Sequence, residues 1–262
     1  MNMIPTESLI SSVVMIGAGN VATHLGQQLY KQGISVAQVF SRNLDKATRL
    51  AQQMEAEPIN DLRRVRPGAD LYLIAVHDSA IAEVAAQLPK QPLFVVHTSG
   101  ATPATVFAAH YQRYGVFYPV QTFSANQPMD FHQIPICIYA ADESDLTLLQ
   151  TLAQRLSQQV HTIDDRQRAI LHVAAVFVNN FTNYLFHIGY DILQQEELPF
   201  NLLRPLIQAT AQKVQQEAPA AMQTGPAIRH DAITIARHMD YLQRFPAYQM
   251  LYKIITKSIQ NQ

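Results

Sequence analysis

Residues 13–22 of the chain, Val-Val-Met-Ile-Gly-Ala-Gly-Asn-Val-Ala, decide the fold of its N-terminal part. The first four residues are apolar, three of them β-branched, and predict a fully buried strand. The next six match the pattern G-x-G-x-x-G/A, and apolar residues then recur with a helical period from Val21 to Tyr30. A strand, a glycine-rich turn and a helix in this order are typical of a dinucleotide-binding βαβ unit.

The residue types in this turn fit the binding of a pyrophosphate. Gly17 allows a tight turn, Gly19 allows a ligand to approach the backbone, and Ala22 lets the helix pack closely on the strand. The free N–H groups at the start of the helix, around Asn20 and Val21, would then hold the phosphates. The alternative is a glycine-rich turn in an α/β protein that binds nothing.

Composition and charge exclude several classes of function. The chain has 262 residues, 48% of them hydrophobic, and a formal net charge of −1, which gives no strongly basic face for nucleic acid. Its single cysteine, Cys137, excludes an internal disulfide and a cysteine-rich metal site, and no metal-ligand spacing of histidines occurs. Residues 1–12 lack the basic n-region and the long apolar h-region of a signal peptide, and no apolar run reaches about 18 residues. We therefore expect a cytoplasmic protein without a membrane span.

The pattern along the chain divides it into a mixed part and a helical part. Over residues 1–163, β-branched runs alternate with amphipathic segments, which predicts a Rossmann-type, doubly wound parallel sheet. Over residues 164–262 the strand-like runs disappear, which predicts an all-helical domain for substrate binding or dimerisation. The expected strands are 13–16, 34–40, 71–76, 93–97, 115–118, 135–140 and 159–163. The expected helices are 20–32, 44–55, 60–65, 78–88, 102–110 and 143–157, followed by 165–195, 199–217, 231–242 and 246–260.

The end of the second expected strand indicates which nucleotide binds. NAD sites usually place an acidic residue here to bind the ribose 2′-hydroxyl. This chain has Ser41, Arg42 and Asn43 instead. A guanidinium pairs with a 2′-phosphate through charge-assisted hydrogen bonds, so the stretch favours NADP(H). A solvated loop arginine is the alternative for Arg42.

Other polar residues follow strands at the carboxyl edge of the sheet, where open α/β sheets bind ligands. Val76 and His77 follow the third long strand, and we expect them to form a wall beside the cofactor. His97 and Ser99 follow the next strand, and their density of hydrogen-bonding groups suggests a reaction site. Gln121 would line the mouth of the pocket. A buried, satisfied histidine is the alternative for His97.

The helix expected over 165–195 carries polar residues on an otherwise apolar surface. With a step of about 100° per residue, His172, Asn180, Asn183 and His187 fall in one stripe about 100° wide. A helix that is apolar on most sides is buried, and buried polar groups need partners. We therefore expect this stripe to face the cofactor cleft; a stripe facing solvent or a dimer seam is the alternative.

The segment before the third helix of the second part adds one candidate. Gly225-Pro226 fixes a turn and Asp231 can cap the helix, which leaves Arg229 to bind an anionic group of a substrate. A surface arginine in a capped turn is the alternative.

Six ordered motifs together resemble a known family. The chain is similar to the Rossmann-like proteins with a DUF2520 C-terminal half, a group similar to pyrroline-5-carboxylate reductase, the coenzyme F420-dependent NADP oxidoreductases and the 6-phosphogluconate and β-hydroxyacid dehydrogenases. The resemblance implies a Rossmann domain, a helical domain and a homodimer built on the long helix. It rests on Gly17–Ala22, Ser41–Asn43, His97–Gly100, Pro119–Phe123, the Leu171-His172…Asn179-Asn180-Phe181 helix, and Gly225-Pro226…Arg229-His230-Asp231.

One departure from the dehydrogenase pattern limits the chemistry. The β-hydroxyacid dehydrogenases have a catalytic lysine three or four residues before an asparagine pair on this helix, whereas this chain has Val176. Valine cannot transfer a proton, so His172 or His97 must supply any acid–base chemistry.

The sequence therefore predicts an NADP(H)-dependent oxidoreductase for a small, anionic substrate. Imine reduction is favoured over ketone or hydroxyacid chemistry because it asks less of a protein base. The alternative is a non-catalytic NADP-binding sensor or interaction protein. The candidate catalytic residues are His172, His97 and Asn180, and the candidate substrate-binding residues are Ser99, Gln121, Asn183 and Arg229.

Overall fold

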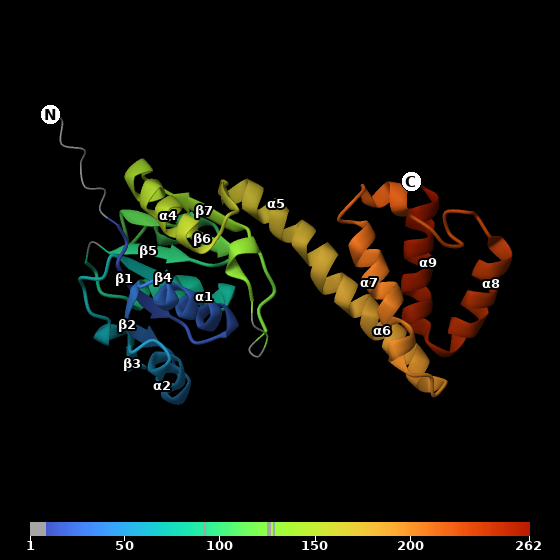
Figure 1. Ribbon diagram of the computed structural model, residues 1–262, viewed down its shortest axis with the longest axis horizontal. Coiled ribbons are helices and arrows are strands. Elements are labelled where there is room, and N and C mark those ends of the chain that lie inside the picture. The colour runs from blue at the N-terminus through green and yellow to red at the C-terminus, as the bar shows by residue number, and fades with distance from the viewer. Residues whose placement is uncertain (1–8, 92, 125–126, 128) are drawn as a thin grey trace. The chain divides into compact units, whose positions relative to one another are not determined.

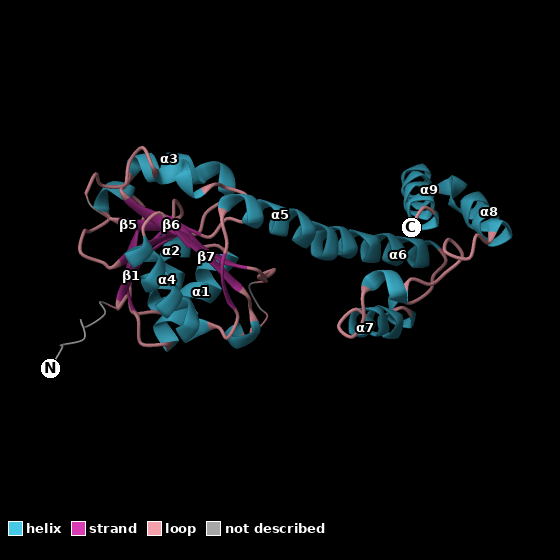
Figure 2. Cartoon of the chain, turned by 90° about the horizontal axis from the view of Figure 1, so that it is seen from above, coloured by secondary structure: helices cyan, strands magenta, loops and turns pink. Residues whose placement is uncertain are grey.

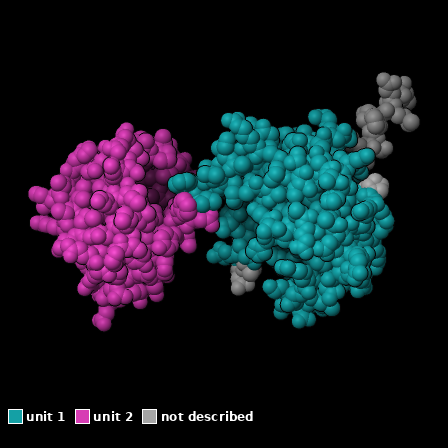
Figure 3. Space-filling view, turned by 180° about the vertical axis from the view of Figure 1, so that it is seen from behind, with its two compact units in different colours: residues 1–179 teal, residues 180–262 magenta. Residues whose placement is uncertain are grey.

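A computed structural model describes residues 9–262 of the chain, except residue 92, residues 125–126 and residue 128. The chain forms two compact units, Met1–Asn179 and Asn180–Gln262, which Figure 3 shows in different colours. The first unit contains the sheet, and the second is built from helices (Figure 1).

The first unit is organised on a sheet of eight strands, counted over the described residues, in the order β3-β2-β1-β4-β5-β6-β7-β8. The direction of the crossovers reverses between β1 and β4, and such a switch point is where open α/β sheets bind ligands at their carboxyl edge. The strands are β1 (Ser12–Ile16), β2 (Ser35–Phe40), β3 (Glu57–Ile59), β4 (Leu71–Ile74), β5 (Phe94–His97), β6 (Arg113–Pro119), β7 (Ile136–Ala140) and β8 (Val160–Thr162). The helices are α1 (Asn20–Lys31), α2 (Leu44–Gln52), α3 (Ile81–Gln87), α4 (Glu143–Leu156) and α5 (Asp165–Ala175), with short 3₁₀ turns at Leu62–Arg64, Asp78–Ala80, Ala104–Phe107 and Phe131–Gln133.

Helices cover both faces of the sheet, as Figure 2 shows for α3 on one side and α1, α2 and α4 on the other. Successive side chains of a strand point to opposite faces. Val13 and Met15 of β1 therefore pack in the core beneath α1, whereas Val14 and Ile16 pack in the core that contains Ile81 of α3. Burial on both faces explains why the strands are apolar without alternation. The predicted fold class is confirmed.

Local predictions differ from the structure at several places, one of which is the helix expected over 60–65, where the structure has the 3₁₀ turn Leu62–Arg64. β6 and β7 pair in antiparallel orientation, because the described part of their connection contains the turn Phe131–Gln133 and no crossover helix. The edge strand β3 was not predicted, since it has only three residues and includes Pro58. The helix expected over 102–110 is the short 3₁₀ turn Ala104–Phe107.

The second unit has the helices that the sequence predicts. Asp231 begins the third of them, where its carboxylate accepts the N–H of Thr234 at 3.0 Å, and Pro246 lies in the first turn of the last. The helices are α6 (Thr182–Gln195), α7 (Arg204–Lys213), α8 (Ala232–Tyr241) and α9 (Pro246–Gln260), with 3₁₀ turns at Phe200–Leu202, Pro219–Met222 and Leu242–Arg244.

The long helix is not a regular α-helix. A π-helical segment, Val176–Phe181, joins α5 to α6. A π turn holds an extra residue, so the residues after it are rotated by roughly 100° relative to a regular helix. The predicted angles of Asn183 and His187 relative to His172 are therefore wrong, because they assumed a constant step.

The long helix is also more exposed than the sequence predicts. Val173, Phe177 and Val178 are 59%, 63% and 74% exposed. The 31-residue helix Asp165–Gln195 has a mean hydropathy of 1.3 over its most apolar window, none of which is buried. By length and composition alone it is able to cross a membrane, which the sequence analysis did not expect. A single helix of this kind is weak evidence for a membrane, since helices of soluble proteins pass the same test.

The compact units divide inside the long helix. The boundary predicted after residue 163 coincides with the change from mixed to helical structure, but α5 stays with the first unit. The Asp165 carboxylate accepts the N–H of Ala104 at 3.0 Å, and Arg168 donates to the carbonyl of Thr102 at 2.6 Å. These bonds attach α5 to the loop after β5, and the division between the units falls after Asn179.

Candidate active site

The glycine-rich turn between β1 and α1 has the geometry of a phosphate site. Gly17 has a φ of +128°, and a Cβ there would lie 2.1 Å from the carbonyl oxygen of Ala75, so only glycine fits. A Cβ at Gly19, by contrast, would meet no atom within 4 Å, so the backbone there is open to a ligand. Gly19 is the N-cap of α1, whose first turn carries no acidic residue. An anion therefore meets free N–H groups and the positive end of the helix.

The side chain of Asn20 has another partner. Its Nδ2 donates to the carbonyl of Phe123 at 2.8 Å, and His24 makes a 2.9 Å hydrogen bond with the carbonyl of Ser124. These bonds attach the segment after β6 to α1. What Asn20 and Val21 offer a pyrophosphate is thus the backbone N–H at the helix start.

The segment after β2 lies beside the same edge of the sheet. The Asn43 Oδ1 caps α2 by accepting the N–H of Lys46 at 3.0 Å, and Ser41 Oγ accepts the N–H of Asn43 at 3.3 Å. Arg42 is exposed between them, and Asp45 lies in the first turn of α2. The arginine and the start of α2 suit a phosphate on the ribose.

The end of β4 forms the wall beside the glycine turn. Val76 lies next to Gly17, since a Cβ on that glycine would come within 3.5 Å of a Val76 methyl group. His77 is exposed at the start of the following 3₁₀ turn. Val76 is thus adjacent to the glycine turn, and its contact with the cofactor stays a prediction.

His97, at the end of β5, is fully buried. Its Nδ1 accepts the N–H of Ser99 at 3.1 Å, so the neutral ring carries its proton on Nε2. Burial, together with the nearby charge of Arg168, lowers the pKa of His97 to about 4. A ring that stays neutral and inaccessible is suited to holding the loop.

Ser99 is also bonded within its own loop. Its Oγ accepts the N–H groups of Ala101 and Thr102 at 3.1 and 2.9 Å and lies 3.0 Å from the Thr102 hydroxyl. Gln121, which is exposed, accepts the N–H of Thr122 at 2.8 Å. The geometry of Ser99 favours a role in shaping the loop after β5.

Tyr118, near the end of β6, meets His172 of α5. The Tyr118 hydroxyl lies 3.3 Å from Nδ1 of His172, and the two rings meet edge to face with centroids 6.3 Å apart. Both side chains are half-buried, and burial raises the pKa of Tyr118, so its phenol keeps its proton near neutral pH. A protonated phenol can donate its proton to a substrate, and the adjacent imidazole can then return a proton to the phenolate.

Gly100 completes this cluster. A Cβ on Gly100 would lie 2.6 Å from His172 Nδ1 and 2.8 Å from Tyr118 Cζ. The loop after β5 therefore contacts the pair directly, and a side chain here would push the imidazole away. That Tyr118 is the partner of His172 could not be seen in the sequence, because the two are 54 residues apart.

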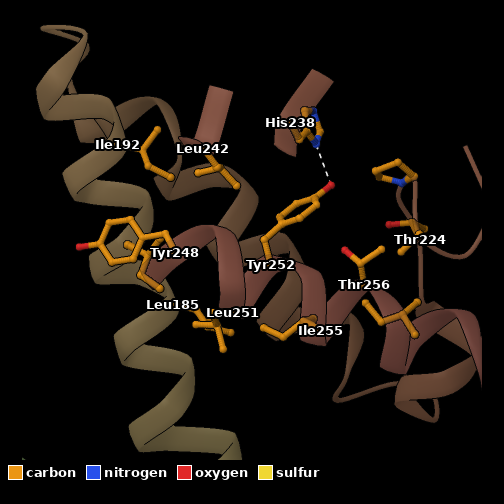
Figure 4. Close-up of a pocket in the computed structure, with 14 residues that line it drawn as sticks. Leu185, Ile192, Thr224, His238, Leu242, Tyr248, Leu251, Tyr252, Ile255 and Thr256 are labelled. Atoms are coloured by element: carbon orange, nitrogen blue, oxygen red, sulfur yellow. Dashed lines mark hydrogen bonds between the residues drawn. The ribbon is translucent and has the colours of Figure 1, made fainter. Parts of the chain in front are cut away.

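The remaining candidates belong to the second unit. Asn180, Asn183 and Arg229 are all exposed. This unit also holds a cavity of about 310 Å³, lined mainly by apolar side chains of α6 and α9 (Figure 4). Its polar lining includes Thr224, Thr256 and the 2.8 Å hydrogen bond between His238 Nδ1 and the Tyr252 hydroxyl, drawn as a dashed line in Figure 4. None of the predicted site residues lines this cavity.

Comparison with solved structures gives the family. A candidate NADP oxidoreductase from Bacteroides fragilis is 42% identical to this chain and superposes with a TM-score of 0.90, over 96% of this chain and 98% of its own. The chain belongs to the family of this NADP oxidoreductase. Within the family fold, residues 12–99 match the model for coenzyme F420-dependent NADP oxidoreductases, and residues 134–259 match the domain of unknown function DUF2520. Both resemblances inferred from the motifs are confirmed.

More distant relatives share the fold or a segment of it. A reductive aminase from Aspergillus terreus, solved with NADPH4, cyclohexanone and allyl amine, is 17% identical with a TM-score of 0.69, over 97% of this chain and 95% of its own. Glutamyl-tRNA reductase of Geobacillus kaustophilus is 34% identical over 93 residues, which is 32% of this chain. The match spans only 20% of the length of that curated relative.

NADP(H) is the cofactor of this family member, and the first unit has the features that it requires. The glycine cradle at Gly17 and Gly19 fits the pyrophosphate. The stretch Ser41–Asn43 fits the 2′-phosphate, since it offers a guanidinium where NAD sites usually have a carboxylate.

Proposed function

We propose that the protein uses NADPH to reduce the C=N bond of a small, anionic imine, and that Tyr118 and His172 supply the proton. The observation that carries this proposal is the Tyr118–His172 pair itself, half-buried at the end of β6. The structural similarity to a reductive aminase supports the choice of imines over ketones at the level of fold.

The roles of the residues follow from their geometry. NADPH, when bound, supplies a hydride to the imine carbon. With His172 protonated on Nδ1, the ring donates to the Tyr118 oxygen, and the phenolic proton is then free for the imine nitrogen. As Tyr118 gives up this proton, His172 replaces it and takes another from solvent. Arg229, Asn180 and Asn183, which belong to the second unit, stay predicted substrate-binding residues.

We also propose that the working form is a cytoplasmic homodimer in which the long helix packs against a second copy. Exposed apolar side chains such as Val173, Phe177 and Val178 support this, since monomeric soluble proteins rarely expose contiguous apolar surfaces. In a membrane, the polar residues Asn179, Asn180 and Asn183 would be costly in the middle of the helix. Light scattering of the detergent-free protein measures this, and a monodisperse monomer would contradict it.

The function is tested by NADPH oxidation against a panel of cyclic imines, ketoacids and aldehydes. We expect turnover with carboxylate-bearing imines, and Tyr118→Phe should lower kcat by about 10²–10⁴-fold because it removes the donor. Tyr139→Phe, on the neighbouring strand β7, is the matched control and should behave like the wild type. Tight NADPH binding without turnover of any substrate would instead support an NADP-binding sensor.

The assignment of the 2′-phosphate site is tested with Arg42→Ala. We expect weaker binding of NADPH by about 1.5–3 kcal/mol, the range for a charge-assisted contact, with little change for NADH. Fluorescence titration with both nucleotides measures this. An equal loss for both would refute the role of Arg42.

A further inference from the structure

Arg168 of α5 is a charged side chain in an unusual place. It is 1% exposed, and it is the largest fully buried side chain among the described residues. Burial of a guanidinium is costly unless the charge is paired and its N–H groups are used. Here, among the described residues, Nε and Nη1 of Arg168 have no hydrogen-bond acceptor. An arginine at this position therefore does little to stabilise the fold, and another reason for its presence is needed.

The bonds that Arg168 does form connect the helix to a loop. Its Nη2 donates to the carbonyl of Thr102 at 2.6 Å and to Oδ1 of Asp165 at 2.8 Å. The same Asp165 carboxylate accepts the N–H of Ala104 at 3.0 Å. One turn of α5 is thereby attached at two points to the loop that follows β5.

This attachment fixes the distance on which the Tyr118–His172 contact depends. His172 lies four residues after Arg168, so both side chains project from the same face of α5. The loop contacts His172 through Gly100, where an added Cβ would be 2.6 Å from Nδ1. A small change in the spacing of loop and helix would therefore move the imidazole relative to the Tyr118 hydroxyl.

We propose that Arg168 is a positioning residue, which clamps α5 to the loop after β5 and so holds His172 against Tyr118. The importance of this position for the reaction rests on the proposed function. The placement of His172 against Tyr118 does not depend on it, because NMR detects that placement without any substrate. The buried His97 agrees with the clamp, because a neutral imidazole tolerates the adjacent guanidinium whereas a protonated one would repel it.

The test uses Arg168→Met in the full-length protein, with Arg166→Met as the matched control, since Arg166 is exposed on the same helix. The readout is the NMR signal of the His172 ring and its response to Tyr118→Phe. In the wild type and in Arg166→Met we expect Tyr118→Phe to shift the signal. In Arg168→Met we expect that response to be lost, because the rings are no longer in contact. An undiminished response in Arg168→Met would overturn the proposal.

Kinetics separate this proposal from the proposed function. With a substrate in hand, Arg168→Met should lower kcat by about 10- to 100-fold while NADPH binding is retained, as expected for a displaced catalytic group. If the NMR response is lost but kcat is unchanged, the clamp exists and the proton pathway is wrong. If Arg168→Met does not fold, Asp165→Asn weakens the same clamp, and a full NMR response in that variant would overturn the proposal.

Discussion

His97 and His172 flank the same loop, yet the structure gives them opposite surroundings. His97 is fully buried, bonded to the backbone of its own loop, and kept neutral by burial and by Arg168. His172 is half-buried and meets a tyrosine from another strand. A histidine beside this loop is thus either buried in the loop's own hydrogen bonding or open enough for the proton transfer that we propose.

Substituting each of the two histidines should give the largest difference between them. We expect His172→Asn to lower kcat by about 10²–10⁴-fold with little change in the melting temperature, because it removes the source of the proton. His97→Asn should lower the melting temperature and leave kcat of the folded protein nearly intact. Steady-state kinetics and calorimetry on both variants measure this. A greater loss of kcat in His97→Asn would reverse the assignment.

The second-largest effect that we expect is the dependence of folding stability on the pKa of His97. Its ring binds a proton near pH 6.5 in the unfolded chain but only near pH 4 in the folded one, so the unfolded state gains protons first as the pH falls. The contribution of His97 to the free energy of unfolding is therefore fully present above pH 6.5 and is lost as the pH falls toward 4. The total loss is roughly 3 kcal/mol. Urea unfolding at a series of pH values measures this, and His97→Asn should flatten the slope. An unchanged slope in the variant would show that other groups cause it.

Ser99 should give the smallest effect. Ser99→Ala removes the acceptor of two backbone N–H groups in the loop, so we expect a loss of about 1–2 kcal/mol in the free energy of unfolding. Turnover should change little. Ser35→Ala, an exposed serine at the start of β2, is the control. A large increase in KM for Ser99→Ala would restore the substrate-binding role that the sequence suggests.

The parts of the fold that depend on local chemistry could be predicted from the sequence. Gly17 marks a turn that only glycine fits, and the apolar strand before it and the helix after it follow from periodicity. The short strand β3, with Pro58 in the middle, carries too weak a pattern to be recognised. The antiparallel pairing of β6 and β7 could not be predicted either, because it depends on where a loop returns.

The candidate site was harder to predict, for a related reason. His97 and His172 look alike in sequence, since burial and partners come from segments far apart in the chain. The role of Tyr118 depends on its contact with α5, and the role of Arg168 depends on its hydrogen bond to the loop after β5. The spacing of Asp165, Arg168 and His172 on one helical face was a signal that could have been used.

The π-helical segment Val176–Phe181 has a consequence for how this family can vary. Such a segment absorbs one extra residue while the helix continues. Deleting that residue would restore a regular helix and turn everything beyond it about the helix axis by roughly 100°. His172, which precedes the segment, would keep its register. Evolution can therefore change the length of this helix by one residue, and reorient the side chains after Phe181, without changing the contact between α5 and the loop after β5.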